Sequence, residues 1–240
     1  MPHGDPGDGR YRVIGPMEGG DALRAVRTDT GTEWVLKPKD GFDSPEVVEL
    51  LKVIRHPGLP RVFDEVECDG RRHLVQELLE GDSLGRVLAR SGGALDPGMA
   101  VRYAAQAARI LSFLHNQGDR CLLHLDIKPD NLLLDPNGRI CLVDFGAARV
   151  LPDPANPDAP RPVHGTPGYA APELLSGNPP GVPCDLYSLG ATLFRLLGGT
   201  VGTGPLDPAD LGADLSPVVR GILGRCLMTR PGDRYRTAAA

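Results

Sequence analysis

The sequence predicts an α+β protein made of two parts. Its first third consists of short β-forming segments separated by Gly, Asp and Thr turns, as in an antiparallel meander. The rest of the chain carries apolar residues at helical spacing. A strand-rich part followed by a helical part is typical of the α+β class, and the change of pattern places the boundary near Glu77–Gly81.

The first part is expected to contain five strands and one helix. Ser44 suits the N-cap of that helix, Pro45 its first turn and Glu46 its positive end. The helix should end at about Ile54, before a Pro-Gly pair, and the Gly/Asp/Pro-rich residues 1–10 should form a flexible tail. The expected strands are Tyr11–Ile14, Ala22–Arg27, Glu33–Lys37, Arg61–Glu67 and His73–Leu78, with a turn at Asp69-Gly70.

The second part is expected to contain two long helices and a hairpin. One helix starts at Asp96-Pro97 and the other runs from about Cys184 to Leu197. The apolar segments Leu132–Leu134 and Ile140–Val143 flank Asn137-Gly138, a pair that favours a tight hairpin turn. The buried face of the first helix is marked by Ala100, Ala104, Ala107, Leu111 and Leu114.

Composition excludes several classes of protein. The net charge of -5 gives no reason to expect nucleic acid or an anionic membrane as a partner. Five cysteines without a C-x-x-C pair favour reduced thiols over a zinc site. The chain shows no apolar run of about 20 residues and no apolar core of a signal peptide near its start, so we expect a cytoplasmic domain.

The chemistry is concentrated between residues 124 and 146. Transfer of a phosphoryl group needs positioning and neutralisation of charge more than covalent help. Asp126 can accept or orient a hydroxyl proton, and Lys128 can steady a γ-phosphate. Asn131 and Asp144 offer the hard oxygen ligands that magnesium prefers, and the expected hairpin would bring them together.

The segment from His124 to Asn131, followed by Asp144-Phe145-Gly146, resembles the catalytic loop and metal-binding motif of the eukaryotic-like Ser/Thr protein kinases. The Lys-Pro after the aspartate is similar to the Ser/Thr branch. Further motifs appear in family order: the substrate-docking loop with Thr166 and Glu173, the start of the central helix at Asp185, and Arg234 as the partner of Glu173.

This resemblance runs from about Tyr11 to Arg234 and implies a two-lobed kinase-like fold. The small N-lobe would span about residues 11–78 and the C-lobe about 81–240. It implies ATP and Mg²⁺ as cofactors and a protein as substrate. The sequence ends at Ala240, soon after Arg234, where the family's last helix would normally still be finishing. We therefore expect that the chain is truncated at its C-terminal end, beyond which a membrane anchor could follow. The high Ala, Gly and Pro usage suggests a bacterial source.

The resemblance also implies a nucleotide site in which Lys37 binds the α- and β-phosphates. Gly15 and Gly20 take two of the three glycine positions of the Gly-rich loop. The adenine would lie between the apolar residues Ile14, Ala22 and Val35 on one side and Leu133 on the other, with the backbone of Glu77 and Leu79 along its edge.

Three positions depart from the family pattern. Met17 stands at the middle glycine, which normally lets the backbone approach the phosphates closely. Glu46, our candidate partner of Lys37, lies one residue before the expected position, and the alternative is that it only favours the helix N-terminus. Leu125 replaces the arginine that many relatives use to pair with a phosphate on the activation loop, a non-RD feature.

Three function classes fit these features to different degrees. An active Ser/Thr kinase accounts for every catalytic position. A pseudokinase that binds nucleotide without transfer draws support from Met17 and from the position of Glu46. A small-molecule kinase would share the catalytic aspartate and the metal ligands, but it is not expected to carry the Lys-Pro pair or the loop ending in Ala-Pro-Glu. We therefore favour the active Ser/Thr kinase.

Overall fold

The computed structural model describes residues 5–239 except 8, 18–19, 40–43, 153–164, 203 and 213–214. The chain divides into two compact units, Met1–Glu80 and Gly81–Ala240. The first unit consists of a β-sheet and a helix, and the second is mainly helical. The predicted α+β class is therefore confirmed.

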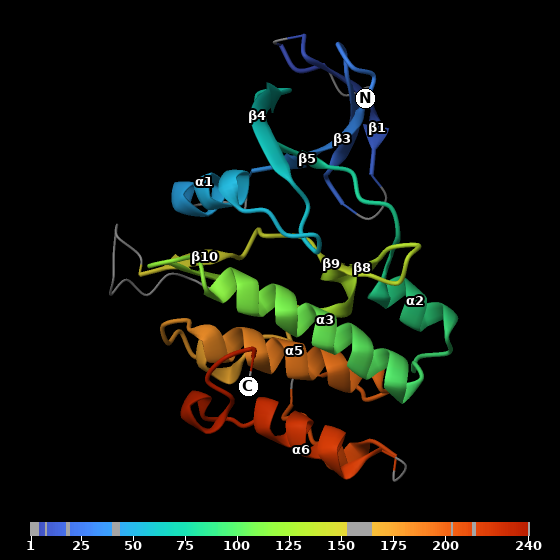
Figure 1. The fold of residues 1–240 in the computed structure, drawn as a ribbon, viewed down its shortest axis with the longest axis vertical. Coiled ribbons are helices and arrows are strands. Elements are labelled where there is room, and N and C mark those ends of the chain that lie inside the picture. The colour runs from blue at the N-terminus through green and yellow to red at the C-terminus, as the bar shows by residue number, and fades with distance from the viewer. Residues whose placement is uncertain are drawn as a thin grey trace. The chain divides into compact units, whose positions relative to one another are not determined.

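The first unit is built on an antiparallel sheet of five strands in the order β1-β2-β3-β5-β4 (Figure 1). Each predicted strand is present within one or two residues of its expected bounds. Asp69 and Gly70, at the turn between β4 and β5, both have positive φ (51° and 74°), as a tight two-residue hairpin turn requires. The strands are β1 Tyr11–Pro16, β2 Leu23–Arg27, β3 Glu33–Pro38, β4 Val62–Cys68 and β5 Arg71–Glu77.

The two faces of this sheet differ in character. Leu36 pairs with Val75, and both belong to a buried apolar cluster on one face. Lys37 pairs with Leu74, which in turn pairs with Glu65, so these three residues form a row across β3, β5 and β4. Because side chains alternate along a strand, this row lies on the face opposite the apolar cluster.

Helix α1 (Pro45–Val53) packs against β4 and buries four apolar side chains. Ser44 stands at its N-cap, as predicted, but the prediction that its side chain caps the helix is wrong. The Ser44 hydroxyl instead donates to Oε2 of Glu46 at 2.7 Å, so it is oriented by that carboxylate and not by the backbone amides of the first turn. The buried residues of α1 are Val47, Val48, Leu50 and Leu51.

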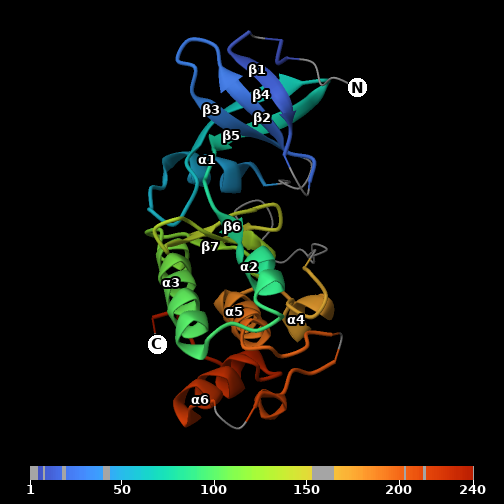
Figure 2. The ribbon, with the colours of Figure 1, turned by 90° about the vertical axis from the view of Figure 1, so that its right-hand side faces the viewer.

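In the second unit, α3 and α5 pack side by side, and α6 packs against α5 (Figure 2). Asp96 caps α3 through its carboxylate, which accepts a hydrogen bond from the Met99 amide at 3.0 Å. Helix α5 is buried along nearly its whole length and forms the centre of this unit. The helices are α2 Leu84–Arg90, α3 Pro97–His115, α4 Pro172–Leu175, α5 Val182–Leu196 and α6 Pro217–Cys226, with single 3₁₀ turns at Pro129–Asn131, Pro208–Asp210 and Pro231–Asp233.

Two small sheets of the second unit hold the segment that the sequence singles out. Strands β8 (Leu132–Leu134) and β9 (Ile140–Leu142) form the predicted hairpin, and β6 (Asp82–Ser83) pairs with β8. Strand β7 (Cys121–Leu123) pairs with β10 (Arg149–Leu151). These pairings fix the backbone on both sides of residues 124–131 and 143–148.

Within the described part of the chain, no helix combines the length and the apolar composition that crossing a bilayer demands.

Candidate active site

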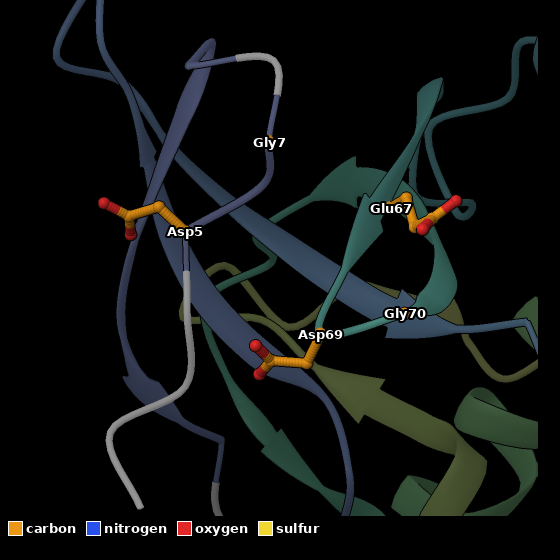
Figure 3. Close-up of a pocket in the computed structure, with 5 residues that line it drawn as sticks. All are labelled: Asp5, Gly7, Glu67, Asp69 and Gly70. Carbon is orange, nitrogen blue, oxygen red and sulfur yellow. The ribbon is translucent and has the colours of Figure 1, made fainter.

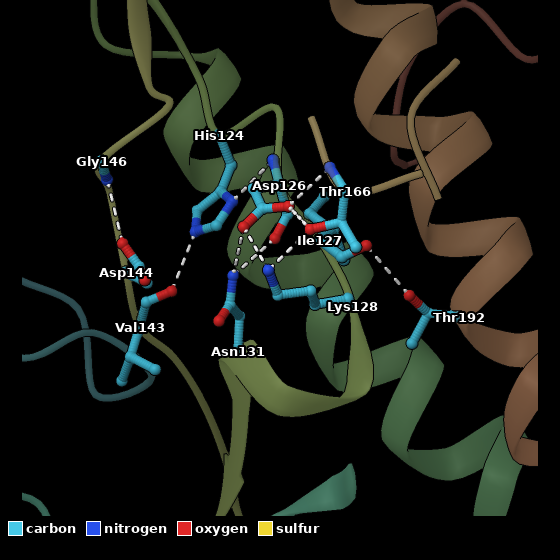
Figure 4. Close-up of polar contacts among 10 residues, drawn as sticks. All are labelled: His124, Asp126, Ile127, Lys128, Asn131, Val143, Asp144, Gly146, Thr166 and Thr192. Atoms are coloured by element: carbon cyan, nitrogen blue, oxygen red, sulfur yellow. Dashed lines mark hydrogen bonds and ion pairs between the residues drawn. The ribbon is translucent and has the colours of Figure 1, made fainter. Parts of the chain in front are cut away.

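The loop after β7 places Asp126 at the centre of a cluster of polar side chains (Figure 4). Its Oδ2 accepts hydrogen bonds from Lys128 Nζ at 2.7 Å and from Asn131 Nδ2 at 3.0 Å. Its Oδ1 accepts one from the Thr166 hydroxyl at 2.6 Å. Lys128 Nζ also donates to that hydroxyl at 2.6 Å. The structure therefore brings together four residues that the sequence places up to 40 positions apart.

The environment of Asp126 keeps its carboxylate ionised. Burial acts to raise its pKa, but the hydrogen bonds from Lys128 and Thr166 favour the charged form and hold the pKa below its ordinary value. The ionised carboxylate can accept a proton or orient a hydroxyl group at neutral pH.

His124, directly before this loop, is a buried structural residue. Its Nε2 lies 3.0 Å from the Val143 carbonyl oxygen, and its Nδ1 accepts a hydrogen bond from the Asp126 amide at 3.3 Å. This pattern requires the neutral tautomer with the proton on Nε2. Burial lowers the pKa of His124, in agreement with a neutral ring. His124 therefore joins the Asp126 backbone to the segment that precedes Asp144.

Asp185, in the first turn of α5, anchors the same loop from the other side. Its carboxylate is fully buried and accepts the backbone amides of His124 at 2.9 Å and Leu125 at 2.7 Å. Leu125 adopts a positive φ of 63°, which is costly for a residue with a branched side chain. The bond from its amide to Asp185 stabilises this conformation, which turns the chain from the buried His124 to Asp126.

Asn131 and Asp144 carry the oxygen atoms expected for a metal site. The β8–β9 hairpin aligns Asn131 with Val143, whose amide donates to the Asn131 carbonyl at 2.9 Å, so Asp144 follows immediately. The Asn131 amide nitrogen also donates to the Asp126 carbonyl at 2.7 Å, and its side-chain oxygen points away from Asp126 (Figure 4). One amide oxygen and one carboxylate suit a hard divalent ion that takes its other ligands from phosphate and water.

A buried ion pair anchors the loop that carries Thr166 to the C-terminal part of the second unit. Glu173 receives two parallel hydrogen bonds from Arg234, at 2.6 and 2.8 Å. Burial acts to raise the pKa of Glu173, but the Arg234 guanidinium outweighs it and lowers that pKa. The predicted partnership of these two residues agrees with this geometry.

Arg234 has all five of its N–H groups satisfied. Besides the two bonds to Glu173, its guanidinium donates to the carbonyl oxygens of Pro183, Thr229 and Met228, at 2.9, 3.1 and 2.7 Å. The ring of Tyr187 lies 4.8 Å from the guanidinium carbon. A fully paired buried arginine fixes the position of the segment that it binds.

The expected nucleotide residues of the first unit lie on and beside the sheet. Val35 is buried and pairs with Gln76, so both share the face of the sheet that carries Lys37. Glu77 ends β5, and its amide donates to the Arg61 carbonyl at 2.8 Å. The other expected residues, Ile14, Gly15, Gly20, Ala22 and Leu79, are partly buried or exposed, as is Leu133 on β8 of the second unit.

The three positions that depart from the family pattern are Met17, Glu46 and Leu125, and the structure describes the surroundings of each. The amide of Met17 donates to the Ala22 carbonyl at 2.7 Å and continues the β1–β2 hairpin. Glu46 lies in the first turn of α1. The side chain of Leu125 is completely buried, so it cannot replace an arginine that reaches a phosphate.

A separate surface hollow in the first unit does not suit phosphate (Figure 3). Three of its five lining residues are acidic, and acidic side chains repel an anion. The hollow is lined by Asp5, Gly7, Glu67, Asp69 and Gly70.

In the described ranges, no group of three or more His, Cys, Asp or Glu side chains could hold a metal ion.

Sequence reasoning missed several residues that support the site. His115 lies 2.8 Å from Asp185 through its Nε2, and the Thr192 hydroxyl donates to the Ile127 carbonyl at 3.2 Å. His124 falls inside the motif, but no role was predicted for it. A polar residue between apolar neighbours, such as Thr192 between Ala191 and Leu193 on α5, is the signal that could have indicated a buried anchor.

Comparisons with known proteins agree with this geometry. The profile of the family described as "Protein kinase domain" matches residues 10–205. Serine/threonine-protein kinase PknA of Mycobacterium tuberculosis is 33% identical over 258 residues, which cover 95% of this chain and 59% of the relative. The chain therefore spans less than two thirds of that protein.

The matches to two further relatives cover smaller shares of those proteins. One is 3-phosphoinositide-dependent protein kinase 1 of Arabidopsis thaliana, 32% identical, with 79% of this chain and 41% of the relative covered. The other is serine/threonine-protein kinase PknB of Mycolicibacterium smegmatis, 30% identical, with 78% of this chain and 32% of the relative covered.

The α+β fold and the cluster around Asp126 are those expected of a protein kinase domain, a family whose members use ATP and a divalent metal ion. The chain belongs to the protein kinase domain family, and it is similar to serine/threonine-protein kinases of that family.

Proposed function

We propose that this domain transfers the γ-phosphoryl group of Mg²⁺-ATP to a serine or threonine hydroxyl of a protein, and that Asp126 orients this hydroxyl. The observation that carries the proposal is the arrangement of Lys128, Asn131 and Thr166 around the ionised Asp126 carboxylate. Proteins catalyse this reaction mainly by positioning and by stabilising charge.

Each polar residue of the cluster takes one task in this proposal. Asp126 accepts the hydrogen bond of the substrate hydroxyl and so directs its oxygen toward the phosphorus. Lys128, held by Asp126 and Thr166, places a positive charge where the γ-phosphate carries negative charge. Asn131 and Asp144 would hold Mg²⁺, which when bound neutralises phosphate charge. Thr166 keeps the substrate loop beside the catalytic loop.

The first unit would supply the nucleotide-binding residues. Lys37 is assigned to the α- and β-phosphates, and Glu46 is its candidate partner. Gly15 and Gly20 would let the β1–β2 connection approach the phosphates. The apolar surface for adenine would come from Ile14, Ala22 and Val35, and its hydrogen-bonding edge from the backbone of Glu77 and Leu79.

The intact cluster favours an active kinase over a pseudokinase. A domain that only binds nucleotide has no need for Asp126, Lys128 and Thr166 to share hydrogen bonds at 2.6–2.7 Å. The docking loop anchored through Glu173 and Arg234 favours a polypeptide substrate over a small molecule. We further propose that the domain works in the cytoplasm, where ATP is available.

The test measures incorporation of γ-labelled phosphate from ATP into a generic basic protein, followed by analysis of the phosphorylated amino acids. We expect label on serine or threonine with Mg²⁺, and none after the metal is chelated. Protein carrying Asp126→Asn controls for contaminating kinases, and Asp119→Asn, at an exposed acid outside the site, controls for the substitution itself. Nucleotide binding without any transfer would contradict the proposal and identify a pseudokinase.

A further inference from the structure

Glu65, on β4, connects two lysines that lie on different elements of the first unit. Its Oε2 accepts from Lys39 Nζ at 2.7 Å, and its Oε1 accepts from Lys52 Nζ at 2.8 Å. Lys39 directly follows β3, and Lys52 lies in the last turn of α1. One carboxylate therefore joins the end of β3, the middle of β4 and helix α1. We call this arrangement the Glu65 bridge.

The Glu65 bridge is more than a surface contact. The side chains of Lys39, Glu65 and Lys52 are 19%, 26% and 29% exposed, whereas Glu49, a second partner of Lys52 at 3.1 Å, is 68% exposed. Hydrogen bonds from the two lysines lower the pKa of Glu65, and the hydrogen bond to Glu65 raises the pKa of Lys52. Partial burial strengthens these charge interactions relative to exposed pairs.

The backbone at both ends of the bridge is fixed by the sheet. The amide of Lys39 donates to the Arg72 carbonyl at 2.8 Å and so extends the pairing of β3 with β5. Glu65 pairs with Leu74, which also pairs with Lys37. Glu65 therefore lies on the face of the sheet that carries Lys37, two strands away from it.

We propose that Glu65 is a positioning residue, which through Lys52 and Lys39 holds α1 in a fixed register against the strand that carries Lys37. Apolar packing of α1 on the sheet is nondirectional and permits small shifts of the helix along its axis. Two hydrogen-bonded ion pairs to one carboxylate add the directional constraint. The inference rests on the proposed function, because Glu46, the candidate partner of Lys37, is carried by α1.

The test compares the kinetics of Glu65→Gln and Glu67→Gln. Both changes remove one negative charge from β4 without altering the size of the side chain, but Glu67 is exposed and lies outside the bridge. We expect Glu65→Gln to lower kcat/KM for ATP by about three- to tenfold at a temperature where the protein is fully folded. Glu67→Gln should leave kcat/KM unchanged.

Substitution of Lys52 tests the mechanism independently. Lys52→Met should reproduce the loss seen for Glu65→Gln, and Lys52→Arg, which keeps the charge, should restore most of the wild-type rate. The double variant Glu65→Gln/Lys52→Met should be no worse than either single change, because both break the same contact. Adding Glu65→Gln to Glu46→Gln should likewise cause little further loss.

The outcomes separate the bridge from the proposed function. If Asp126→Asn abolishes transfer but Glu65→Gln behaves like Glu67→Gln, the bridge has no positioning role and the proposed function stands. A lower melting temperature for Glu65→Gln with unchanged kcat and KM would also refute the positioning role. If Asp126→Asn transfers phosphate normally, the proposed function itself fails.

Discussion

At the residue scale, the proposed mechanism depends on keeping one carboxylate ionised although it is partly buried. Asp126 achieves this because Lys128 and Thr166 donate hydrogen bonds to its two oxygens. The same three residues connect the catalytic loop to the substrate loop. Thr166 is therefore part of the charge environment of Asp126 as well as part of the substrate loop.

We predict that Thr166→Val lowers kcat by about tenfold and shifts its acid limb to higher pH. The hydroxyl stabilises ionised Asp126, so its loss raises the pKa of that residue and activity fails sooner as the pH falls. Rates measured as the pH falls from 7 toward the ordinary aspartate value of 3.8 test this, and Thr166→Ser should behave like the wild type. An unshifted profile in the valine variant would show that Thr166 does not influence Asp126.

Arg234→Met should lower the free energy of unfolding by about 3–5 kcal/mol, because it leaves Glu173 buried without a counter-charge. The pKa of Glu173 is lowered in the folded state, so the stability from this pair is complete above its ordinary value of 4.5 and is lost as the pH falls through the folded value. Denaturant titrations at pH 7 and pH 4 measure both effects.

The difference between the wild type and Arg234→Met should shrink at pH 4, below the ordinary glutamate value of 4.5, because the unfolded chain then binds a proton at Glu173 that the folded wild type resists. Arg230→Met, at an exposed arginine nearby, serves as the control and should change stability by less than about 0.5 kcal/mol. Equal losses in the two variants would show that the buried pair has no special weight.

Some of these residue contacts could be predicted from the sequence and others could not. The motif order pointed to Asp126, Lys128 and Asn131, and the structure joins them. The side chain of Ser44 was expected to accept a backbone amide and cap α1, but its hydroxyl donates to the nearby Glu46 carboxylate instead. The links from His115 and Thr192 cross 70 and 65 residues, and no local pattern reports such contacts.

At the element scale, the position of α1 on the sheet matters most, because this helix carries Glu46. Its apolar face and the Glu65 bridge hold it on the sheet, and Glu46 lies in its first turn. The nearby positive helix end gives Glu46 a structural reason to be there whether or not it serves Lys37.

Glu46→Gln distinguishes the two roles. If Glu46 positions Lys37, as we expect, kcat/KM for ATP should fall by about tenfold or more. If it only complements the helix dipole, the change should be confined to about 0.3–1 kcal/mol of stability. Steady-state kinetics and thermal unfolding of the same preparation decide between them, with Glu67→Gln as the control at an exposed glutamate outside α1.

Elements with strong local signals were predicted well. Helix α3 has an Asp-Pro start and a long apolar face, and the β8–β9 hairpin has Asn-Gly at its turn. Helices α2 and α6 were missed because both contain glycine, which weakens a helical pattern. Strands β7 and β10 have three residues each and depend on pairing across 26–30 positions, which periodicity cannot report.

At the scale of the whole molecule, the loop between the Asp-Phe-Gly turn and Thr166 bears on whether the domain is regulated by phosphorylation. Residues 147–165 include no serine, threonine or tyrosine. The Pro-rich part of this loop, residues 153–164, lies outside the described residues. Leu125, at the usual phosphate-binding arginine position, is buried and apolar. A phosphate switch needs a hydroxyl group that takes the phosphate and an arginine that binds it. Residues 147–165 offer no such hydroxyl, and Leu125 stands in place of the arginine.

We predict that the domain is active without phosphate on this loop. Exhaustive dephosphorylation, verified by intact mass, should leave the initial rate of transfer within about twofold of the untreated enzyme, since no phosphate–arginine pair is lost. An inactive dephosphorylated enzyme that recovers only after modification of Thr166 would contradict this prediction.

The central claim is that Asp126 serves the substrate hydroxyl and not the nucleotide, and Asp126→Asn tests it most directly. We predict that the single-turnover rate of phosphate transfer falls by about 10²–10⁴-fold, the range expected for loss of a general base, while the dissociation constant for Mg²⁺-ATP changes by less than about threefold. Asp119→Asn should match the wild type in both measurements. A variant at Asp126 that transfers phosphate at the wild-type rate, or that loses nucleotide binding together with transfer, would contradict the account.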